Sequence, residues 1–275
     1  MIENEEYPDF KAEIGPSKYE AGTKNKIKPG LYIVATPIGN LRDITLRALD
    51  IFEAADIVLC EDTRITKRLL NAYGIQKQLL AYHDHNADKM RPKVIEELQA
   101  GKIIAQASDA GTPLISDPGY KLVRDCLDNN FDVYPIPGAS APLTALAAAG
   151  LPSDKFMFIG FLPTKKMARI SHLRENNPEN TTLICFESPK RLSSAIKDIA
   201  EVWPDRQIVV ARELTKMFEE FKRGTATELS AYYEEASAPK GEIVILLGPM
   251  AKQEADEKDV LSMLKDALKD NSLRD

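Results

Sequence analysis

The chain has 275 residues, a net charge of −6 and an isoelectric point near 5.3. This acidic balance excludes a protein that coats nucleic acid through bulk phosphate binding, although it leaves room for an enzyme with a local basic face. Hydrophobic residues make up 44% of the chain and charged residues 28%, as in globular proteins with a buried core. No apolar run approaches the length of a membrane span.

Both ends of the chain are polar. Residues 1–28 carry scattered charge without a sustained period and lack the apolar core of a signal peptide, so we predict a flexible leader. The pattern in residues 260–268 predicts an amphipathic helix within a polar tail of residues 251–275.

The three cysteines, Cys60, Cys126 and Cys185, lie far apart in apolar stretches. This distribution favours buried free thiols over a disulfide framework or a zinc site. We therefore expect a reducing, cytoplasmic location.

Residues 29–138 alternate short apolar runs with helical stretches. The runs predict strands at residues 31–35, 57–60, 79–82, 103–107 and 133–136. The intervening stretches predict helices at residues 44–55, capped by Asp43, and at 63–73, 89–100 and 120–129. Such alternation indicates βαβ units, a mostly parallel sheet and an α/β fold.

The same alternation begins again after Pro137-Gly138, so we predict a second α/β domain at residues 139–250. A small-residue helix at 143–149 precedes predicted strands at residues 156–161, 183–186, 208–211, 218–223 and 243–247. Ser188-Pro189 and the spacing of Thr225 and Glu228 are typical of helix starts, the second of a capping box.

Ligands of open α/β sheets bind beyond the carboxyl ends of the strands, so the segments after the strands are candidates. Residues 36–41 follow the first strand and either bring backbone amides close to a ligand or form a plain turn. After the second strand, Glu61 could orient or deprotonate a substrate hydroxyl and Arg64 could hold a phosphate. Helix capping by Asp62 or Thr63 is the alternative there.

The third and fourth strands lead into further polar segments. His83 is a candidate base, whereas a metal pair of His83 and His85 lacks the ligands that would complete it, so we predict no metal. Residues 108–119 include Asp109, whose carboxylate could accept hydrogen bonds from ribose hydroxyls or from an ammonium group. They also include Gly111, where the backbone can approach a ligand closely. Asp117-Pro118 could simply start a helix, but the repeated Ser-Asp pattern, at 108–109 and 116–117, is unusual for a turn and favours a functional role for this segment.

The absent motifs narrow the function further. No G-x-G-x-x-G, P-loop, G-x-S-x-G or H-E-x-x-H motif occurs, which disfavours NAD enzymes, NTPases, serine hydrolases and zincins. Basic residues gather in the second domain and would suit either an RNA-facing patch or a solvated surface. They are Lys165, Lys166, Arg169, Arg174, Lys190, Arg191, Lys216, Lys222 and Arg223.

The ordered motifs resemble those of the ribosomal RNA small subunit methyltransferase I family, within the tetrapyrrole methylase-like fold, from Gly30 to about Gly248. The segments that carry the resemblance are 36–41, 61–64, 83–86, 108–119, 150–152, 160–163, 187–192, 211–216 and 240–242. The segment 108–119 is the most specific of them. The family usually has proline where this chain has Ala139.

This resemblance implies S-adenosylmethionine in the cleft between two α/β domains, a homodimer, and 2'-O-methylation of a cytidine ribose in the decoding region of 16S rRNA in the small ribosomal subunit. It implies cofactor contacts at Pro37, Ile38, Gly39, Ser108, Asp109, Ala110, Thr112, Pro113, Ile115, Ser140, Ala141, Phe186, Leu214 and Gly241. The small residues at Ser140 and Ala141 would leave space for a flat ligand, although Ser140 also suits a helix cap.

On this basis Glu61 and His83 are the candidate proton acceptors for the ribose hydroxyl. The expected RNA contacts are Arg64, Lys165, Lys166, Arg169, Lys190, Arg191, Arg212 and Lys216. Two rival functions stay open, a small-molecule methyltransferase of the same fold acting on a tetrapyrrole and a non-enzymatic RNA-binding module. The second of these predicts no affinity for the cofactor.

Overall fold

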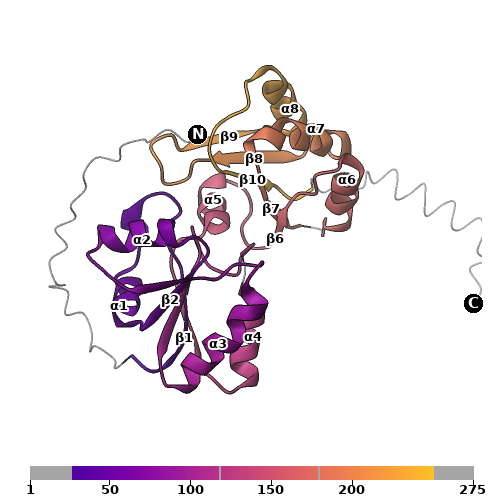
Figure 1. Ribbon diagram of the computed structural model, residues 1–275. Coiled ribbons are helices and arrows are strands. Elements are labelled where there is room, and N and C mark those ends of the chain that lie inside the picture. The colour runs from indigo at the N-terminus through magenta and orange to yellow at the C-terminus, as the bar shows by residue number, and fades with distance from the viewer. Residues whose placement is uncertain (1–26, 118, 179, 251–275) are drawn as a thin grey trace, which may run out of the picture.

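The computed structural model describes residues 27–117, 119–178 and 180–250. The predicted leader lies outside these residues except for Ile27 and Lys28, and the predicted tail with its helix lies wholly outside them. Two five-stranded sheets dominate the described chain, one in each half (Figure 1). No helix of the described ranges is long and apolar enough to cross a membrane.

The first sheet has the strand order β3-β2-β4-β1-β5, and every pairing in it is parallel. Its strands are β1 (Gly30–Val34), β2 (Ile57–Cys60), β3 (Gln78–Ala81), β4 (Ile103–Ala107) and β5 (Val133–Ile136). The parallel sheet expected from the strand–helix alternation is thus confirmed. All five strands point their carboxyl ends toward the same edge of the sheet.

Helices cover both faces of the first sheet, so its strands are apolar on both sides. They are α1 (Leu46–Ala54), α2 (Thr63–Ala72), α3 (Ala87–Gln99) and α4 (Tyr120–Asp128). Phe52 of α1 and Leu70 of α2 pack in the core on one face, and Val94 of α3 and Leu122 of α4 in the core on the other.

The start of α1 corrects one expectation. The side chain of Thr45 accepts a hydrogen bond from the backbone N–H of Ala48, so Thr45 caps the helix. Asp43, the predicted cap, lies instead at the end of the short 3₁₀ helix η1 (Leu41–Asp43).

The second sheet has the order β6-β7-β10-β8-β9 and is mixed. Its strands are β6 (Phe156–Phe161), β7 (Thr182–Glu187), β8 (Gln207–Arg212), β9 (Glu220–Thr225) and β10 (Ile243–Leu247). Only β6 and β7 pair in parallel, whereas β10 inserts antiparallel between β7 and β8, and β8 and β9 form an antiparallel pair. The parallel arrangement of the first domain therefore does not repeat in the second.

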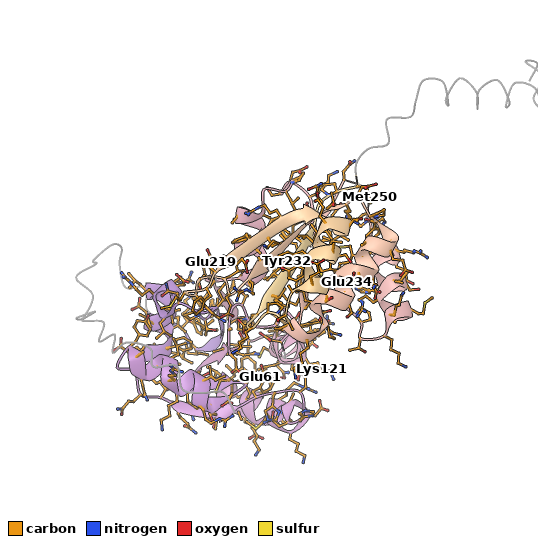
Figure 2. All side chains as sticks on the ribbon, turned by 90° about the horizontal axis from the view of Figure 1, so that it is seen from above. Glu61, Lys121, Glu219, Tyr232, Glu234 and Met250 are labelled. Carbon is orange, nitrogen blue, oxygen red and sulfur yellow. The ribbon has the colours of Figure 1, made fainter. Side chains whose placement is uncertain are left out.

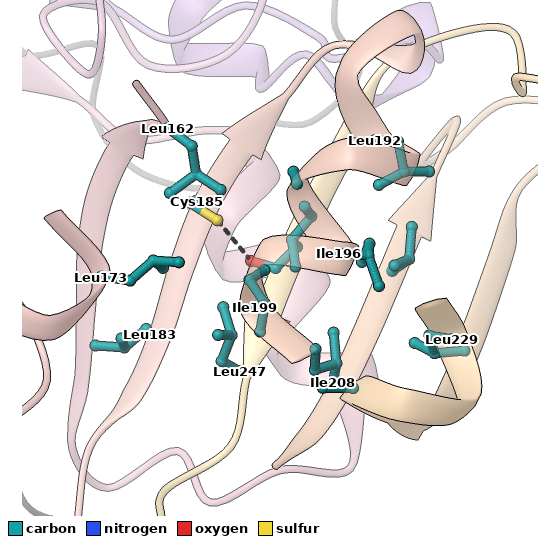
Figure 3. Packing of buried hydrophobic residues seen from close by; sticks show 14 of the residues in the cluster. Leu162, Leu173, Leu183, Cys185, Leu192, Ile196, Ile199, Ile208, Leu229 and Leu247 are labelled. Carbon is teal, nitrogen blue, oxygen red and sulfur yellow. Dashed lines mark hydrogen bonds between the residues drawn. The ribbon is translucent and has the colours of Figure 1, made fainter. Parts of the chain in front are cut away.

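Helices α6 (Lys166–Glu175), α7 (Leu192–Val202) and α8 (Ala226–Glu235) pack on one face of the second sheet. Figure 3 shows the core between them, where the buried Cys185 thiol donates to the carbonyl of Ile245. All three cysteines are buried and free, as predicted. The Thr225–Glu228 capping box is also confirmed, since each side chain accepts from the other residue's backbone N–H.

The opposite face of the second sheet carries α5 (Ala141–Ala149), which lies between the two sheets in Figure 1. Ala145 and Leu146 of α5 pack with Val244 of β10, and Ile38 of the first domain joins the same cluster. This shared apolar cluster fixes the second sheet against the carboxyl edge of the first.

Arg169 of α6 is buried and donates from Nε and Nη2 to Asp198 of α7, at 2.8 and 2.5 Å. Its Nη1 donates to the carbonyl of Pro163. Because this ion pair ties two helices together inside the protein, Arg169 is not available to RNA, which corrects the sequence-based expectation.

Replacing Arg169 by methionine leaves the carboxylate of Asp198 buried without its partner. We expect Arg169→Met to lower the free energy of unfolding by about 3–5 kcal/mol in urea denaturation. The matched control is Lys166→Met, because the ion pair of Lys166 with Glu201 is exposed and its loss should change stability little. Equal effects of the two substitutions would contradict a structural role for the Arg169–Asp198 pair.

Candidate functional site

The strand order of the first sheet determines which polar side chains meet at its carboxyl edge. His83 follows β3, Glu61 follows β2 and Asp109 follows β4, and these three strands are neighbours. On the other side of β4, Ile38 follows β1 and Ser140 follows β5. Residues far apart in the chain therefore form one row, with Asp109 at its centre (Figure 2 shows Glu61 in the first domain).

One part of this row lines a cavity of about 390 Å³, here called the acidic cavity. Its lining consists of Glu61, Asp62, Thr63, Ala81, His83, His85 and Asp109. Both predicted proton acceptors, Glu61 and His83, thus share one cavity. Among the described residues no group of three or more side chains is arranged to hold a metal ion.

A second cavity of about 420 Å³ lies between the two domains and is here called the interdomain cavity. On the first-domain side it is lined by Ile38 and by residues 109–112 and 115–117. On the second-domain side it is lined by the start of α5, the end of β6, the end of β7 with the residues after it, Leu214, and the residues at the start of β10. Asp109 lines both cavities, which makes it their common wall.

Ten of the fourteen residues predicted to contact the cofactor line the interdomain cavity. They are Ile38, Asp109, Ala110, Thr112, Ile115, Ser140, Ala141, Phe186, Leu214 and Gly241. Ser140 is the N-cap residue of α5, as the sequence also allowed, but its side chain makes no capping hydrogen bond and lines the cavity.

The other four, Pro37, Gly39, Ser108 and Pro113, do not line this cavity. Pro37 and Pro113 are buried, and the Ser108 hydroxyl donates within its own turn, to the carbonyls of Ala110 and Gly111. Gly39 serves packing between the domains, because a Cβ there would lie 2.6 Å from Cγ of Lys216. These residues hold the cavity walls in place rather than forming them.

The wall that contains Asp109 is a tightly constrained turn. Thr36 and Gly111 exchange backbone hydrogen bonds of 2.9 and 3.0 Å, so the loops after β1 and β4 are joined. Leu114 and Ser116 both have positive φ, 72° and 66°. Non-glycine residues in this region carry strain that clusters at functional sites.

A network of charges shapes the second-domain wall. Lys216 donates to Glu213 at 2.8 Å and to Glu242 at 3.0 Å, and the backbone N–H of Glu242 donates to Glu213. Burial alone would raise the pKa of Glu213, but the hydrogen bonds from Lys216 and Glu242 outweigh it and lower that pKa. Gly241 has φ +95° and leaves room for Glu213, since a Cβ would lie 2.2 Å from its Cδ.

Two of the cations expected to bind phosphate therefore have structural partners. Lys216 holds the network of Glu213 and Glu242, and Arg212 donates to Glu220 and to the carbonyl of Lys240. Arg64 is largely exposed, but its guanidinium is held by Asp62, which also caps α2. The helix-capping alternative at Asp62 is thus what the structure shows.

Of the remaining cations predicted to contact RNA, two have ion-pair partners and two are exposed without one among the described residues. Arg191 pairs with the buried Glu187 at 2.6 Å, and Lys166 pairs with Glu201. Lys165 and Lys190 are exposed, and neither has an ion-pair partner within the described ranges. They are the predicted second-domain cations best placed to contact a phosphate.

Three carboxylates at the junction of the two cavities have a raised pKa, mainly because they are partly buried and in addition because other carboxylates lie near them. Burial, which is the largest cause, and the charges of Glu61 and Asp109 together raise the pKa of Asp117 to about 6, although a hydrogen bond from Ser108 acts in the opposite direction. Burial and the charges of Asp109 and Asp84 raise the pKa of Glu61. Burial also raises the pKa of Asp109. A cation that enters this junction would relieve the repulsion.

Gly111, where the sequence predicted close approach of the backbone to a ligand, also lines the interdomain cavity. The lining residues that the sequence did not predict as cofactor contacts are Ser116, Asp117, Pro142, Phe161, Glu187, Ser188, Pro189, Glu242, Ile243 and Val244. Asp117 had a signal in the repeated Ser-Asp pattern, which favoured a functional role for its segment, but it was not among the predicted cofactor contacts because Asp117-Pro118 also suits a helix start. Ile243 and Val244 carried none, because the insertion of β10 between β7 and β8 is a long-range pairing.

The comparisons with known proteins agree with this architecture. A family profile described as Tetrapyrrole (Corrin/Porphyrin) Methylases matches residues 30–230. "Ribosomal RNA small subunit methyltransferase I" of Mesorhizobium japonicum is 53% identical over 232 residues, covering 84% of this chain and 79% of that protein. The protein of the same name from Escherichia coli O157:H7 is 47% identical, covering 82% and 80%.

The chain belongs to the ribosomal RNA small subunit methyltransferase I family. Its fold is shared with more distant solved structures. A cobalt precorrin-4 methyltransferase superimposes with a TM-score of 0.59 at 19% identity, covering 79% of this chain and 94% of that one. The uroporphyrin-III C-methyl transferase of Thermus thermophilus, complexed with S-adenyl homocysteine, gives 0.56 at 17% identity, covering 79% and 96%. The α/β fold of the tetrapyrrole methylases expected from the sequence is therefore confirmed for this family member.

The raised pKa of Asp117 predicts a dependence of stability on pH. A carboxyl whose pKa is higher in the folded state contributes stability below its unfolded pKa of 3.8 and loses it as the pH rises through about 6. Asp117→Asn should therefore raise the free energy of unfolding at pH 8 by about 1 kcal/mol and leave it nearly unchanged at pH 4. Urea denaturation at both values tests this, with the exposed Asp154→Asn as control. A loss of stability at pH 8 would contradict the account of the junction.

Proposed function

We propose that this protein transfers the methyl group of S-adenosylmethionine to a ribosomal RNA of the small subunit. The finer part of the proposal is that the acceptor is the ribose 2'-hydroxyl of a cytidine in the decoding region of 16S rRNA, within the small ribosomal subunit. The observation that carries it is the position of Asp109, which lines both a cavity of cofactor size and the cavity that holds the two candidate bases.

The interdomain cavity has the composition that a bound S-adenosylmethionine requires. Apolar side chains of Ile38, Leu214 and Phe186 suit a flat base, and Gly241 admits close backbone approach. Asp109 and Asp117 place carboxylates where the ligand's ammonium and sulfonium charges would be favourable. When bound, the cofactor supplies an electrophilic methyl group on its cationic sulfur.

The residues of the acidic cavity would act on the acceptor. A ribose hydroxyl is a weak nucleophile at neutral pH, so its proton must leave during or after attack. Glu61 can accept that proton in its ionised form, and His83 lies in the same cavity with a buried Nδ1 that has no hydrogen-bond partner among the described residues. Holding acceptor and donor in line contributes most, up to about 7–11 kcal/mol of the barrier.

The partners follow from the same proposal. We expect the protein to act in the cytoplasm, on rRNA, as a homodimer of this chain. Light scattering at micromolar concentration tests the dimer directly, and a mass of one chain would contradict it.

The function is tested with labelled S-adenosylmethionine and purified small ribosomal subunits that lack their own modification. After the reaction, the rRNA is digested and its nucleosides are separated. We expect label in 2'-O-methylcytidine. Label in another nucleoside would refute the proposed acceptor. Label only in an added tetrapyrrole, with none in rRNA, would refute the proposed substrate.

Glu61→Gln and His83→Ala test the base in the same assay. If either group accepts the proton, its loss should lower kcat by about 10²- to 10⁴-fold while cofactor affinity by calorimetry stays within a few-fold. His85→Ala is the matched control, because His85 lines the same cavity and is exposed. Full activity of both variants would leave positioning as the only contribution.

The raised pKa of Glu61 gives a pH signature. The ionised form is the base, so kcat/KM should rise with pH through a pKa above the usual value for glutamate. Glu61→Gln should abolish that rising limb. A limb that persists unchanged in this variant belongs to another group.

A further inference from the structure

Phe161 stands out among the lining residues that the sequence did not single out as a contact. It ends β6, lines the interdomain cavity and is 57% exposed. Large aromatic side chains usually bury most of their surface, so an exposed ring at the rim of a cavity is a candidate for ligand contact.

A β-bulge directs this ring toward the cavity. Phe158 pairs with Ile184 and Phe161 with Phe186, so three steps along β6 match two along β7. Side chains alternate between the faces of a strand, and the extra residue returns Phe161 to the face of Phe158. Both rings contact Phe186, with centroid distances of 4.9 Å for Phe158 and 5.3 Å for Phe161.

Glycine makes the bulge possible. Gly160 has φ +68°, which other residues adopt only with strain. Its surroundings are open, since a Cβ at this position would have the Ser116 hydroxyl as its nearest neighbour, 4.0 Å away. Glycine is therefore needed at position 160 for the backbone conformation of the bulge and not for close packing.

Phe161 lies in the part of the site where the acceptor is expected to bind. A Cβ on Gly160 would lie 4.0 Å from the Ser116 hydroxyl, so the bulge lies near the segment that follows Asp109. Phe161, Ser116 and Asp109 line the same interdomain cavity, and Asp109 also lines the acidic cavity. Ile115, also on the rim, is 44% exposed.

The volume of the interdomain cavity, about 420 Å³, lies in the range of pockets that bury one small ligand. With a cofactor inside, the base of the acceptor nucleotide would have to lie at the rim. Lys165 is four residues beyond Phe161, and Lys190 directly follows Pro189, which lines the cavity. Both exposed ammonium groups suit the flanking phosphates of an RNA.

We propose that Phe161 is the stacking platform for the unpaired base of the acceptor nucleotide, held in place by the Gly160 bulge. This inference rests on the proposed function and adds the group that positions the base. Proteins recognise single-stranded RNA mainly by stacking its splayed bases on aromatic rings. An RNA held in this way presents its ribose to the junction at Asp109.

The test combines substitutions of Phe161 with removal of the acceptor base from the RNA. Phe161→Ala and Phe161→Trp are assayed for methyl transfer to an RNA with an intact acceptor nucleotide and to the same RNA with an abasic one, which keeps its 2'-hydroxyl. Phe161→Ala should lower kcat/KM on the intact RNA by about 5- to 100-fold, and Phe161→Trp should retain activity. On the abasic RNA, wild type and Phe161→Ala should be equal.

The matched control is Phe156→Ala, because Phe156 is also exposed but lies at the opposite end of β6. It should leave transfer to the intact RNA unchanged. S-adenosylhomocysteine affinity, measured by calorimetry, should stay within about twofold in all variants, as expected for a ring that contacts RNA and not the cofactor.

Two results would overturn the proposal. One is an equal loss from Phe161→Ala on intact and abasic RNA, and the other is a matching loss of S-adenosylhomocysteine affinity, which would place the ring on the cofactor. If the wild type labels no RNA at all, the proposed function fails first. The stacking is then judged by fluorescence anisotropy with single-stranded RNA, where equal affinity of wild type and Phe161→Ala refutes it.

Discussion

The site depends on the parallel arrangement of the first sheet. Because all five strands run the same way, the loops that follow them meet at one edge, and the order β3-β2-β4-β1-β5 sets the sequence of side chains along it. The central strand β4 ends just before Asp109, which separates the acidic cavity from the interdomain cavity. An antiparallel arrangement would send neighbouring loops to opposite edges and would not bring Glu61, His83 and Asp109 together.

The second domain forms the opposite wall of the interdomain cavity, and ion pairs stabilise the conformation of that wall. Lys216 joins Glu213 and Glu242, the loop of Gly39 packs against Lys216, and the backbone of Asn40 donates to Thr215. The two domains are thereby fixed at the point where a ligand would be enclosed between them. Several cations that the sequence suggested for RNA binding instead pair with buried or partly buried carboxylates, namely Arg169 with Asp198, Arg191 with Glu187 and Lys216 with Glu213.

Local patterns predicted the first domain well, because parallel βαβ units place consecutive elements beside one another. The row from His83 to Ser140 followed from the rule that ligands lie beyond strand ends, and most expected cofactor contacts line one cavity. The features that the sequence did not predict depend on contacts between residues far apart in the chain. Nothing local signals that β10 inserts between β7 and β8, that Arg169 faces Asp198, or that a bulge turns Phe161 toward the cleft. Asp117 lies in a segment that the sequence marked as functional, but its position in the cavity was not predicted because Asp117-Pro118 also suits a helix start.

We expect one ligand to lie between the domains with its reacting end at the wall formed by Asp109. A crystal structure of the protein with S-adenosylhomocysteine would show whether it does. The expected density is enclosed by Ile38 and Thr112 on one side and by Leu214 and Gly241 on the other, with the sulfur toward Asp109 and the acidic cavity left open for the acceptor. Density in the acidic cavity, or bound to one domain alone, would contradict this expectation.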